Sequence, residues 1–175
     1  KYSSYGRETG GIERVQICRS HYKAAVMIQS YISIGSNIDA TKNITSAKRE
    51  LSNIFTCTYS DNFYSKAEGF KGKDFINLVA GFETSLDPIS LTQTLKSLEK
   101  KIGRDTNQKG MRDRVIDLDL ILFGDLIMKD QGIELPSSDI EDYLFILEPL
   151  AQIAEKEIHP VFNISFGEML KEKLK

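Results

Sequence analysis

Apolar residues recur along the chain with two different periods, and the alternation of these periods predicts its elements. In residues 27–37 (MIQSYISIGSN), every second position from Ile28 to Ile34 shares one face, as in a strand, and Gly-Ser-Asn then predicts a turn. Residues 38–55 change to helical spacing, with Asp39 or Thr41 as the expected N-cap. The apolar stripe of this helix is Ile44, Ala47, Leu51 and Ile54.

The middle of the chain predicts two strands separated by a loop. Residues 56–65 are rich in β-branched and aromatic residues, which favours a single strand. Residues 67–74 contain two glycines and two lysines and are expected to form the loop. In residues 74–84, one strand face carries Ile76, Leu78, Ala80 and Phe82, and the other carries Phe75, Asn77 and Val79.

A second helix and a last strand are marked more sharply. Asp87 is the expected N-cap, Pro88 takes the first helical position and Gly103 ends the helix. A polar, cationic loop leads into residues 112–125 (RDRVIDLDLILFGD), which predict a buried strand. Its apolar face is Ile116, Leu118, Leu120 and Leu122.

The order of elements from Ile28 to Phe123 is therefore β-α-β-β-α-β. Right-handed connections turn this order into an antiparallel sheet covered by helices, so we expect an α/β (α+β) fold, a ferredoxin-like βαββαβ sandwich. The C-terminal additions are a short strand near residues 126–128, a helix near residues 140–147 and a short terminal helix.

Length and composition predict one soluble globular domain. The chain has 175 residues, of which 41% are hydrophobic and 27% charged, enough for a sizeable core. We expect residues 27–175 to form this domain and residues 1–26 to be a poorly ordered N-terminal extension, or alternatively an extra packed element. The chain has two cysteines, Cys18 and Cys57, which lie far apart and do not indicate a disulfide framework. We therefore expect a cytoplasmic location. No apolar run approaches 18 residues, so no membrane span or membrane partner is expected.

Positive charge is concentrated in one segment of a mildly acidic chain. The net charge is −2, yet residues 96–114 contain seven Lys or Arg residues against three acids. This contrast indicates a small anionic ligand rather than nucleic acid or an anionic membrane. The chain has no P-loop, and the isolated His21 and His159 are interpreted as ordinary residues rather than ligands.

Asp117 and Asp119 share the polar face of the last strand, with Cα atoms roughly 6.5–7 Å apart. Two like charges at this spacing repel, so a cation or a basic group is expected between them. Mg²⁺ binds carboxylate oxygens together with substrate phosphates, and the planar guanidinium of Arg114 suits phosphate. The alternative is a solvated sheet face on which both aspartates merely pair with lysines.

Asn77 interrupts a strong strand on the same face as Phe75. One interpretation is an edge-strand amide that meets water. The second is an amide that offers a donor and an acceptor to a flat heterocycle, with an aromatic ring stacked nearby.

Four stretches of the chain, YISIGSN, DFINLVAGFETSLDP, LEKKIGR and RDRVIDLDLILFGD, closely resemble the 6-hydroxymethyl-7,8-dihydropterin pyrophosphokinase family of folate biosynthesis. The resemblance covers about residues 31–150. It implies a ferredoxin-like fold and an ATP-dependent pyrophosphokinase (a diphosphotransferase). Such an enzyme moves the terminal pyrophosphoryl group of ATP onto the hydroxymethyl oxygen of hydroxymethyldihydropterin and releases AMP.

The resemblance also implies roles for individual residues. Asp117 and Asp119 are similar to the pair that holds two Mg²⁺ ions against the ATP phosphates. Asn77 resembles the amide that reads the pterin ring edge, and Phe75 and Phe145 resemble aromatic residues of the pterin pocket. On the ATP side the matching residues are the catalytic arginines Arg104 and Arg114 and the acid Glu99. Lys109 and Arg112 are further ATP-binding candidates, because their position in the cationic loop would let them replace positive charge that the family has and this chain lacks.

The chain departs from the family pattern at several positions. Ser137 and Ser138 stand where the family usually has His-Tyr or His-Pro, Tyr143 replaces an arginine, and Thr106 and Met111 replace a loop arginine and a tryptophan. These departures leave open a pterin-binding paralogue with altered or lost kinase activity. An RNA-binding ferredoxin-like module and a regulatory small-ligand domain without chemistry also stay open. We expect a monomer, with a dimer as the alternative.

Overall fold

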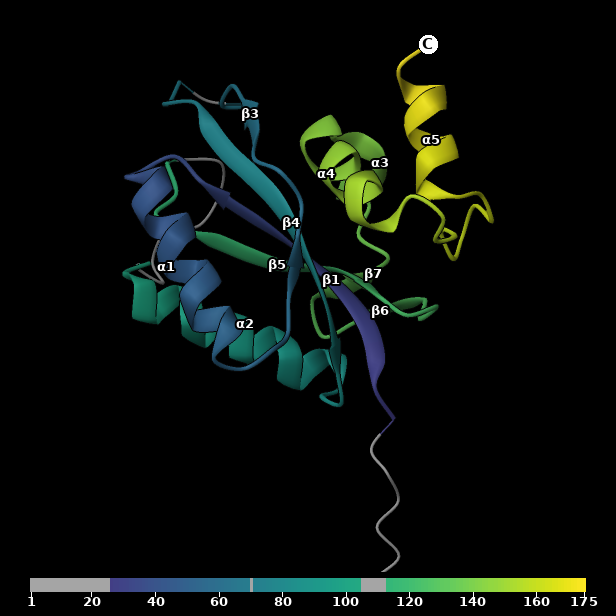
Figure 1. Ribbon diagram of the computed structural model, residues 1–175, viewed down its shortest axis with the longest axis horizontal. Coiled ribbons are helices and arrows are strands. Elements are labelled where there is room, and N and C mark those ends of the chain that lie inside the picture. Colours follow the sequence, from purple (N-terminus) through teal and green to yellow (C-terminus); the bar gives the residue numbers. More distant parts are fainter. Residues whose placement is uncertain (1–25, 70, 105–112) are drawn as a thin grey trace, which may run out of the picture.

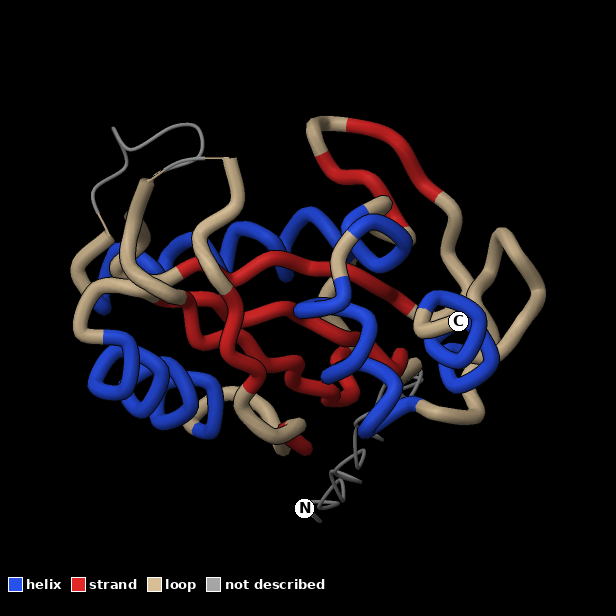
Figure 2. Tube along the Cα trace, turned by 90° about the horizontal axis from the view of Figure 1, so that it is seen from above, coloured by secondary structure: helices blue, strands red, loops and turns tan. Residues whose placement is uncertain are grey.

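A five-stranded antiparallel sheet runs through the middle of the computed structural model, which describes residues 26–69, 71–104 and 113–175 (Figure 1). Helices lie on both faces of this sheet (Figure 2). Its strands are β1 (Ile28–Ser36), β2 (Thr58–Tyr59), β3 (Phe63–Ser65), β4 (Phe75–Thr84) and β5 (Asp117–Phe123). Their order is β2-β4-β1-β5, and β3 pairs with the beginning of β4.

The strand order confirms the expected ferredoxin-like arrangement. When the short β2 and β3 count as one strand, the last strand lies beside the first, and the third strand separates the first from the second. The helices are α1 (Ala40–Ser52), α2 (Pro88–Ile102), α3 (Asp139–Asp142), α4 (Leu144–Ala154) and α5 (Phe166–Lys173), and a separate hairpin consists of β6 (Met128–Asp130) and β7 (Ile133–Leu135).

Local sequence explains where the two crossover helices begin and end. The Asp87 carboxylate caps α2 as predicted, because it accepts hydrogen bonds from the backbone N–H groups of Ile89 and Ser90 at 3.0 and 2.9 Å. Gly103 ends α2 with a φ of 113°, a left-handed conformation that favours glycine. α1 begins after Asp39, one of the two predicted N-caps, although this side chain makes no capping hydrogen bond.

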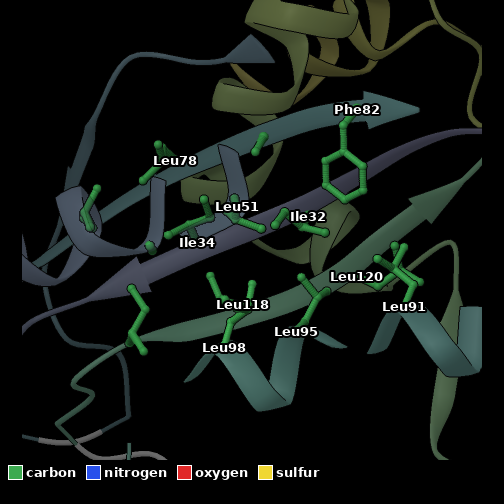
Figure 3. Close-up of a cluster of buried hydrophobic side chains, with 14 of the residues drawn as sticks. Ile32, Ile34, Leu51, Leu78, Phe82, Leu91, Leu95, Leu98, Leu118 and Leu120 are labelled. Carbon is green, nitrogen blue, oxygen red and sulfur yellow. The ribbon is translucent and has the colours of Figure 1, made fainter. Parts of the chain in front are cut away.

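The main core lies between the sheet and the pair α1 and α2 (Figure 3). One face of each central strand points to this side, as the period of two predicts. Each fully buried aliphatic side chain stabilises the fold by about 1.5–3 kcal/mol. The fully buried members include Ile32, Ile34 and Leu78 from the strands and Leu51, Leu91 and Leu95 from the helices.

A bulge in β5 changes one prediction about this core. Ile32 of β1 pairs with Leu120, but its neighbour Tyr31 pairs with Leu122, so Ile121 is an extra residue. The bulge reverses the alternation of faces, and Leu122 packs in a second core on the other side of the sheet. The expectation that Leu122 shares the face of Leu120 is therefore wrong.

The strand predicted over residues 56–65 is divided into β2 and β3. At the break, the Ser60 side chain replaces a backbone acceptor of the sheet, because its hydroxyl accepts a hydrogen bond from the Val79 N–H at 2.9 Å. Ile54, expected on the apolar stripe of α1, lies beyond the end of that helix and is 48% exposed.

The C-terminal additions are more elaborate than predicted. The short strand expected near residues 126–128 begins at Met128 and pairs with β7, which the sequence pattern did not indicate. The helix expected near residues 140–147 is two helices, because Tyr143 between α3 and α4 has extended backbone angles. The short terminal helix is confirmed as α5.

The second face of the sheet is covered by α4 over part of its length. Tyr31 of β1, 3% exposed, packs there with Val79, Leu147 and Leu150. An RNA-binding sheet of this topology needs exposed aromatic residues on its central strands, so an RNA-binding module is not favoured.

Some expectations concern residues outside the described ranges. These are the poor order of residues 1–25 and the polar, cationic loop before the last strand, most of which is residues 105–112. Both stay predictions. Among the described helices, none is long and apolar enough to cross a membrane.

Candidate active site

A cleft of about 360 Å³ opens on the second face of the sheet, beside the start of α4. Its volume lies in the range of small-molecule sites. Three strands lead from the second core into this cleft, because alternate residues of a strand share a face. On this face of the three strands, the residues that line the cleft are Phe75 and Asn77 of β4, Ser33 and Gly35 of β1, and Asp117 and Asp119 of β5.

Asn77, Gly35 and Asp117 lie in one row across these strands. Gly35 pairs with Asn77 on one side and with Asp117 on the other. Two strand spacings put the backbones of Asn77 and Asp117 roughly 10 Å apart. A Cβ atom at position 35 would lie 3.1 Å from the Asn77 Oδ1 atom. Gly35 therefore keeps the floor between the amide and the carboxylate open.

The end of the cleft around Asn77 is aromatic. Tyr143 and Phe145 stack with ring centroids 4.8 Å apart, and Phe75 lines the same cleft. The Asn77 side chain is buried, and its Nδ2 atom donates to the Ser65 hydroxyl at 2.9 Å. Because β4 lies between β1 and the short β2 and β3, the edge-strand interpretation of Asn77 is wrong.

The opposite end of the cleft is charged, and buried Glu99 of α2 organises it. Glu99 Oε1 accepts hydrogen bonds from the Leu118 backbone N–H at 2.7 Å and from Lys96 Nζ at 2.8 Å. Its Oε2 atom lies 2.6 Å from Arg104 Nη1. Burial of an unpaired carboxylate costs several kcal/mol, so these three partners are what make Glu99 tolerable in this position.

Lys96, one turn earlier on α2, lies among the carboxylates. Its Nζ atom is 2.7 Å from Asp119 Oδ1 and 3.7 Å from Asp117 Oδ1, in addition to the bond with Glu99. It also donates to the Leu118 carbonyl at 3.2 Å. Lys96 thus pairs with both aspartates, as the alternative interpretation expected, but the two carboxylates line a cleft rather than a solvated sheet face.

Two of the described arginines reach Asp117. Arg104 forms an ion pair with the Asp117 carboxylate as well as with Glu99, and Arg114 Nε lies 3.5 Å from Asp117 Oδ2. Asn37 fixes the backbone of Arg114, whose N–H donates to Asn37 Oδ1 at 2.6 Å and whose carbonyl accepts from the Asn37 N–H at 3.1 Å. We call Lys96, Glu99, Arg104, Arg114, Asp117 and Asp119 the charged cluster.

Burial and mutual charge change the proton affinities in this cluster. Desolvation by the surrounding protein, and then the nearby Asp117 carboxylate, raise the pKa of Asp119, although about half of this side chain stays exposed and Lys96 opposes the shift. Burial alone would lower the pKa of Lys96 and of Arg104, but their carboxylate neighbours outweigh it and the pKa of both is raised. Both cations therefore stay charged, while Asp119 takes up a proton more readily than an ordinary aspartate.

The carboxylates of the cluster fit a hard divalent cation. Glu99, Asp117 and Asp119 each offer an oxygen atom, and these oxygens lie within 4.8 Å of one another. Carboxylate oxygens are the ligands that Mg²⁺ prefers. The side chains of Asp117 and Asp119 are 28% and 49% exposed, whereas that of Glu99 is 3% exposed. The two aspartates are thus the accessible members of the set.

The structure brings the described site residues predicted from the sequence into one place. The aromatic end of the cleft has Phe75, Asn77 and Phe145, and the charged cluster has Glu99, Arg104, Arg114, Asp117 and Asp119. Lys109 and Arg112 lie outside the described residues.

Among the described residues of the site, several had no role predicted from the sequence, and three of them, Lys96, Gly35 and Tyr143, matter for its geometry. Lys96 was visible only as one basic residue of the 96–114 segment, although its spacing of three from Glu99 could have indicated an ion pair on one helix face. Gly35 was interpreted as part of a turn rather than as the floor of a cleft. For Tyr143, nothing in the sequence indicated stacking on Phe145.

Comparisons with known proteins point to one family. The model of the 7,8-dihydro-6-hydroxymethylpterin-pyrophosphokinase family matches residues 31–155. A 2-amino-4-hydroxy-6-hydroxymethyldihydropteridine pyrophosphokinase from Haemophilus influenzae is 32% identical over 151 residues, which cover 83% of this chain and 93% of the relative. The same enzyme from Aquifex aeolicus is 31% identical over 149 residues, or 83% and 92% of the two chains. The folic acid synthesis protein FOL1 of Dictyostelium discoideum is 34% identical over 143 residues, 79% of this chain but 22% of that longer protein.

Proposed function

The chain belongs to the 7,8-dihydro-6-hydroxymethylpterin-pyrophosphokinase family, and we propose that its cleft carries out the family reaction with Asn77 at the pterin end and the charged cluster at the ATP end. The protein is a transferase that uses ATP as co-substrate and moves a pyrophosphoryl group onto 6-hydroxymethyl-7,8-dihydropterin in folate biosynthesis. The assignment of individual residues to these roles is the proposal.

The observation that carries the proposal is the row Asn77–Gly35–Asp117. It separates a buried amide from a carboxylate by roughly 10 Å of open floor. A flat bicyclic ring with a one-carbon arm spans such a distance. The ring edge would lie at Asn77, and the hydroxyl on the arm would point towards the carboxylates.

At the pterin end, the residues recognise a flat and polar ring. The Asn77 side chain combines a donor with an acceptor, as the amide-like edge of a pterin requires. Phe75 and the Tyr143–Phe145 stack supply aromatic faces against which the ring can pack. These contacts would fix the orientation of the ring, so that its hydroxymethyl group is held in line with the phosphates of ATP.

At the ATP end, Asp117 and Asp119 would hold Mg²⁺, and we propose two ions. Their exposed oxygens face the cleft beside one another, and the donor set fits this cation. When bound, Mg²⁺ supplies neutralisation of the phosphate charge and lowers the pKa of the attacking hydroxyl. Glu99 and Lys96 position β5, because they bind the backbone N–H and carbonyl of Leu118 between the two aspartates.

The transfer itself forms one bond and breaks another. The pterin hydroxymethyl oxygen attacks the β-phosphorus of ATP and loses its proton, while the bond from that phosphorus to the bridging oxygen of the α-phosphate breaks and AMP leaves. Arg104 and Arg114 lie next to Asp117, where they would offset charge that develops on the phosphates.

The test is a direct assay of the purified chain. AMP release is measured with ATP, Mg²⁺ and 6-hydroxymethyl-7,8-dihydropterin, and again without the pterin. The proposal expects release that needs both substrates. Calorimetric titration of the pterin, with and without a non-hydrolysable ATP analogue, separates binding from chemistry.

The result also decides between the enzyme and the paralogue without kinase activity. Pterin binding with no AMP release would support the paralogue and overturn the proposed catalytic roles. Release of AMP that does not depend on the pterin would instead indicate hydrolysis of ATP, and it would contradict the role of Asn77 in pterin recognition.

A further inference from the structure

Lys96 has a position in the charged cluster that the family reaction does not by itself require. Building on the proposed function, we infer that the Lys96 ammonium is a resident cation that competes with Mg²⁺ for Asp119 and makes tight metal binding dependent on the nucleotide. It is a positioning and regulatory residue rather than a catalytic one. Without nucleotide, the two aspartates are already neutralised from within the chain.

The geometry places the ammonium where a metal ion would have to bind. Lys96 Nζ lies 2.7 Å from Asp119 Oδ1, 2.8 Å from Glu99 Oε1 and 3.7 Å from Asp117 Oδ1. These carboxylates are the ones whose oxygens lie within 4.8 Å of one another. One group therefore already contacts every carboxylate of the candidate metal site.

Among the described residues of the charged cluster, the charges balance without any added ion. Three carboxylates, Glu99, Asp117 and Asp119, are paired with three cations, Lys96, Arg104 and Arg114. A divalent ion added alone would give this neutral cluster a net charge of +2. The phosphates of a nucleotide, which are negative, remove that excess. Metal and nucleotide should therefore each raise the affinity for the other.

The backbone of β5 keeps Lys96 in place. The ammonium donates to the Leu118 carbonyl at 3.2 Å, while Glu99 holds the N–H of the same residue. The Lys96 side chain is nevertheless 39% exposed. It thus has both a fixed position next to the aspartates and access to solvent from which an ion can displace it.

The test is Mn²⁺ binding to the nucleotide-free full chain, followed through the electron paramagnetic resonance signal of free Mn²⁺. Lys96→Gln removes the charge and keeps a hydrogen-bond donor for the Leu118 carbonyl, and Lys96→Met is a second variant without any donor. We expect Lys96→Gln to bind Mn²⁺ roughly tenfold more tightly than the wild type, because a unit charge within 4 Å opposes a divalent ion. Lys100→Gln, an exposed residue of the same helix, should stay within about twofold of the wild type.

A second titration adds a non-hydrolysable ATP analogue. The gain in Mn²⁺ affinity that the analogue produces should be smaller in Lys96→Gln than in the wild type, because the variant no longer needs phosphates to balance the charge. Thermal unfolding of each variant with and without Mn²⁺ checks that the fold is intact. In Lys96→Gln the metal should raise the melting temperature more than in the wild type.

The outcomes separate this inference from the proposed function. Equal Mn²⁺ affinity of Lys96→Gln and the wild type, or an equal gain in Lys100→Gln, overturns the role of Lys96. Asp119→Asn, measured in parallel, tests the metal site itself. If Asp119→Asn binds Mn²⁺ like the wild type, the metal assignment fails; if it loses binding while Lys96→Gln changes nothing, the inference about Lys96 alone fails.

Discussion

The two faces of β5 share one backbone and differ in almost everything else. Leu118 and Leu120 on one face are 0% and 8% exposed and pack in the main core. Asp117 and Asp119 on the opposite face line the cleft. Because successive side chains of a strand point to opposite sides, a single short element contributes both to packing and to chemistry. Substitutions one residue apart should therefore separate loss of fold from loss of activity.

Leu118 shows how closely the two faces are connected. Its side chain is completely buried in the core, while its backbone N–H and carbonyl are bound by Glu99 and Lys96 of the charged cluster. The outer edge of β5 would otherwise present unpaired backbone groups at this residue. The cluster thus completes the sheet edge and also prepares the site, so part of its charge has a structural use.

The largest effect is expected on the cleft face. Asp119→Asn removes a metal-binding oxygen while the side chain keeps its size, so kcat for AMP release should fall by at least about 10³-fold. The fold should survive, because this side chain is half exposed. Steady-state kinetics and circular dichroism melting curves measure the two quantities. A kcat close to that of the wild type would remove Asp119 from the reaction.

The core face should respond in the opposite way. Leu118→Ala creates a cavity in the main core, so the free energy of unfolding should fall by about 2–5 kcal/mol. Well below the melting temperature, kcat should stay within about an order of magnitude of the wild-type value, since no charged group is lost. Urea unfolding together with the AMP assay tests both parts. A loss of kcat as large as that of Asp119→Asn would show that the two faces cannot be separated.

A smaller and more selective effect is expected at the aromatic end of the cleft. Asn77→Ala leaves the pterin edge without its hydrogen-bond partner, which should weaken pterin binding by about ten- to a hundredfold. The KM for ATP should not change, because Asn77 and Asp117 are on strands that β1 separates. Calorimetric titration of the pterin measures the effect, with Ser65→Ala, which removes only the partner of the amide, as the control. Equal losses for pterin and ATP would contradict the division of the cleft into two ends.

The smallest effect concerns His159, which lies outside the cleft. Burial lowers the pKa of this imidazole, and its Nδ1 atom accepts hydrogen bonds from the N–H groups of Val161 and Phe162 at 3.2 and 3.4 Å. Below about pH 6.5 the unfolded chain binds a proton that the folded chain does not. The free energy of unfolding should therefore decrease as the pH is lowered, by at most about 1.4 kcal/mol per pH unit.

His159→Asn provides the comparison, because its side-chain oxygen can accept the same hydrogen bonds without titrating. The variant should show a shallower loss of stability between the ordinary histidine pKa and the lowered value in the folded state. Parallel pH profiles of unfolding for the two proteins would exclude His159 as the source. The pH profile of kcat should be the same in both.

Much of the fold could be predicted because local rules agree with the final packing. The alternation in β4 correctly separated its core face from its cleft face, and Asp87, Pro88 and Gly103 marked both ends of α2. Asp117 and Asp119 could be predicted as site residues because two carboxylates on one face of an otherwise apolar strand indicate that this face is not part of the core.

Further features depend on contacts that are distant in sequence. The bulge at Ile121 results from the pairing of β1 with β5, which a single strand pattern does not contain. The break at Ser60 depends on its hydrogen bond with Val79 of another strand. Lys96 became part of the site only when α2 was packed beside β5, since a lysine on a helix is otherwise an ordinary exposed residue.

The catalytic roles proposed for the charged cluster depend on Asp117 and Asp119 binding the metal ions that carry the phosphates of ATP. To test this binding, Mn²⁺ ions bound per chain are counted in the presence of a non-hydrolysable ATP analogue, in the wild type, Asp117→Asn, Asp119→Asn and Leu118→Ala. We predict two ions in the wild type and in Leu118→Ala, and loss of at least one ion in each aspartate variant. Undiminished binding of both ions in the two aspartate variants would show that the metal ions bind elsewhere.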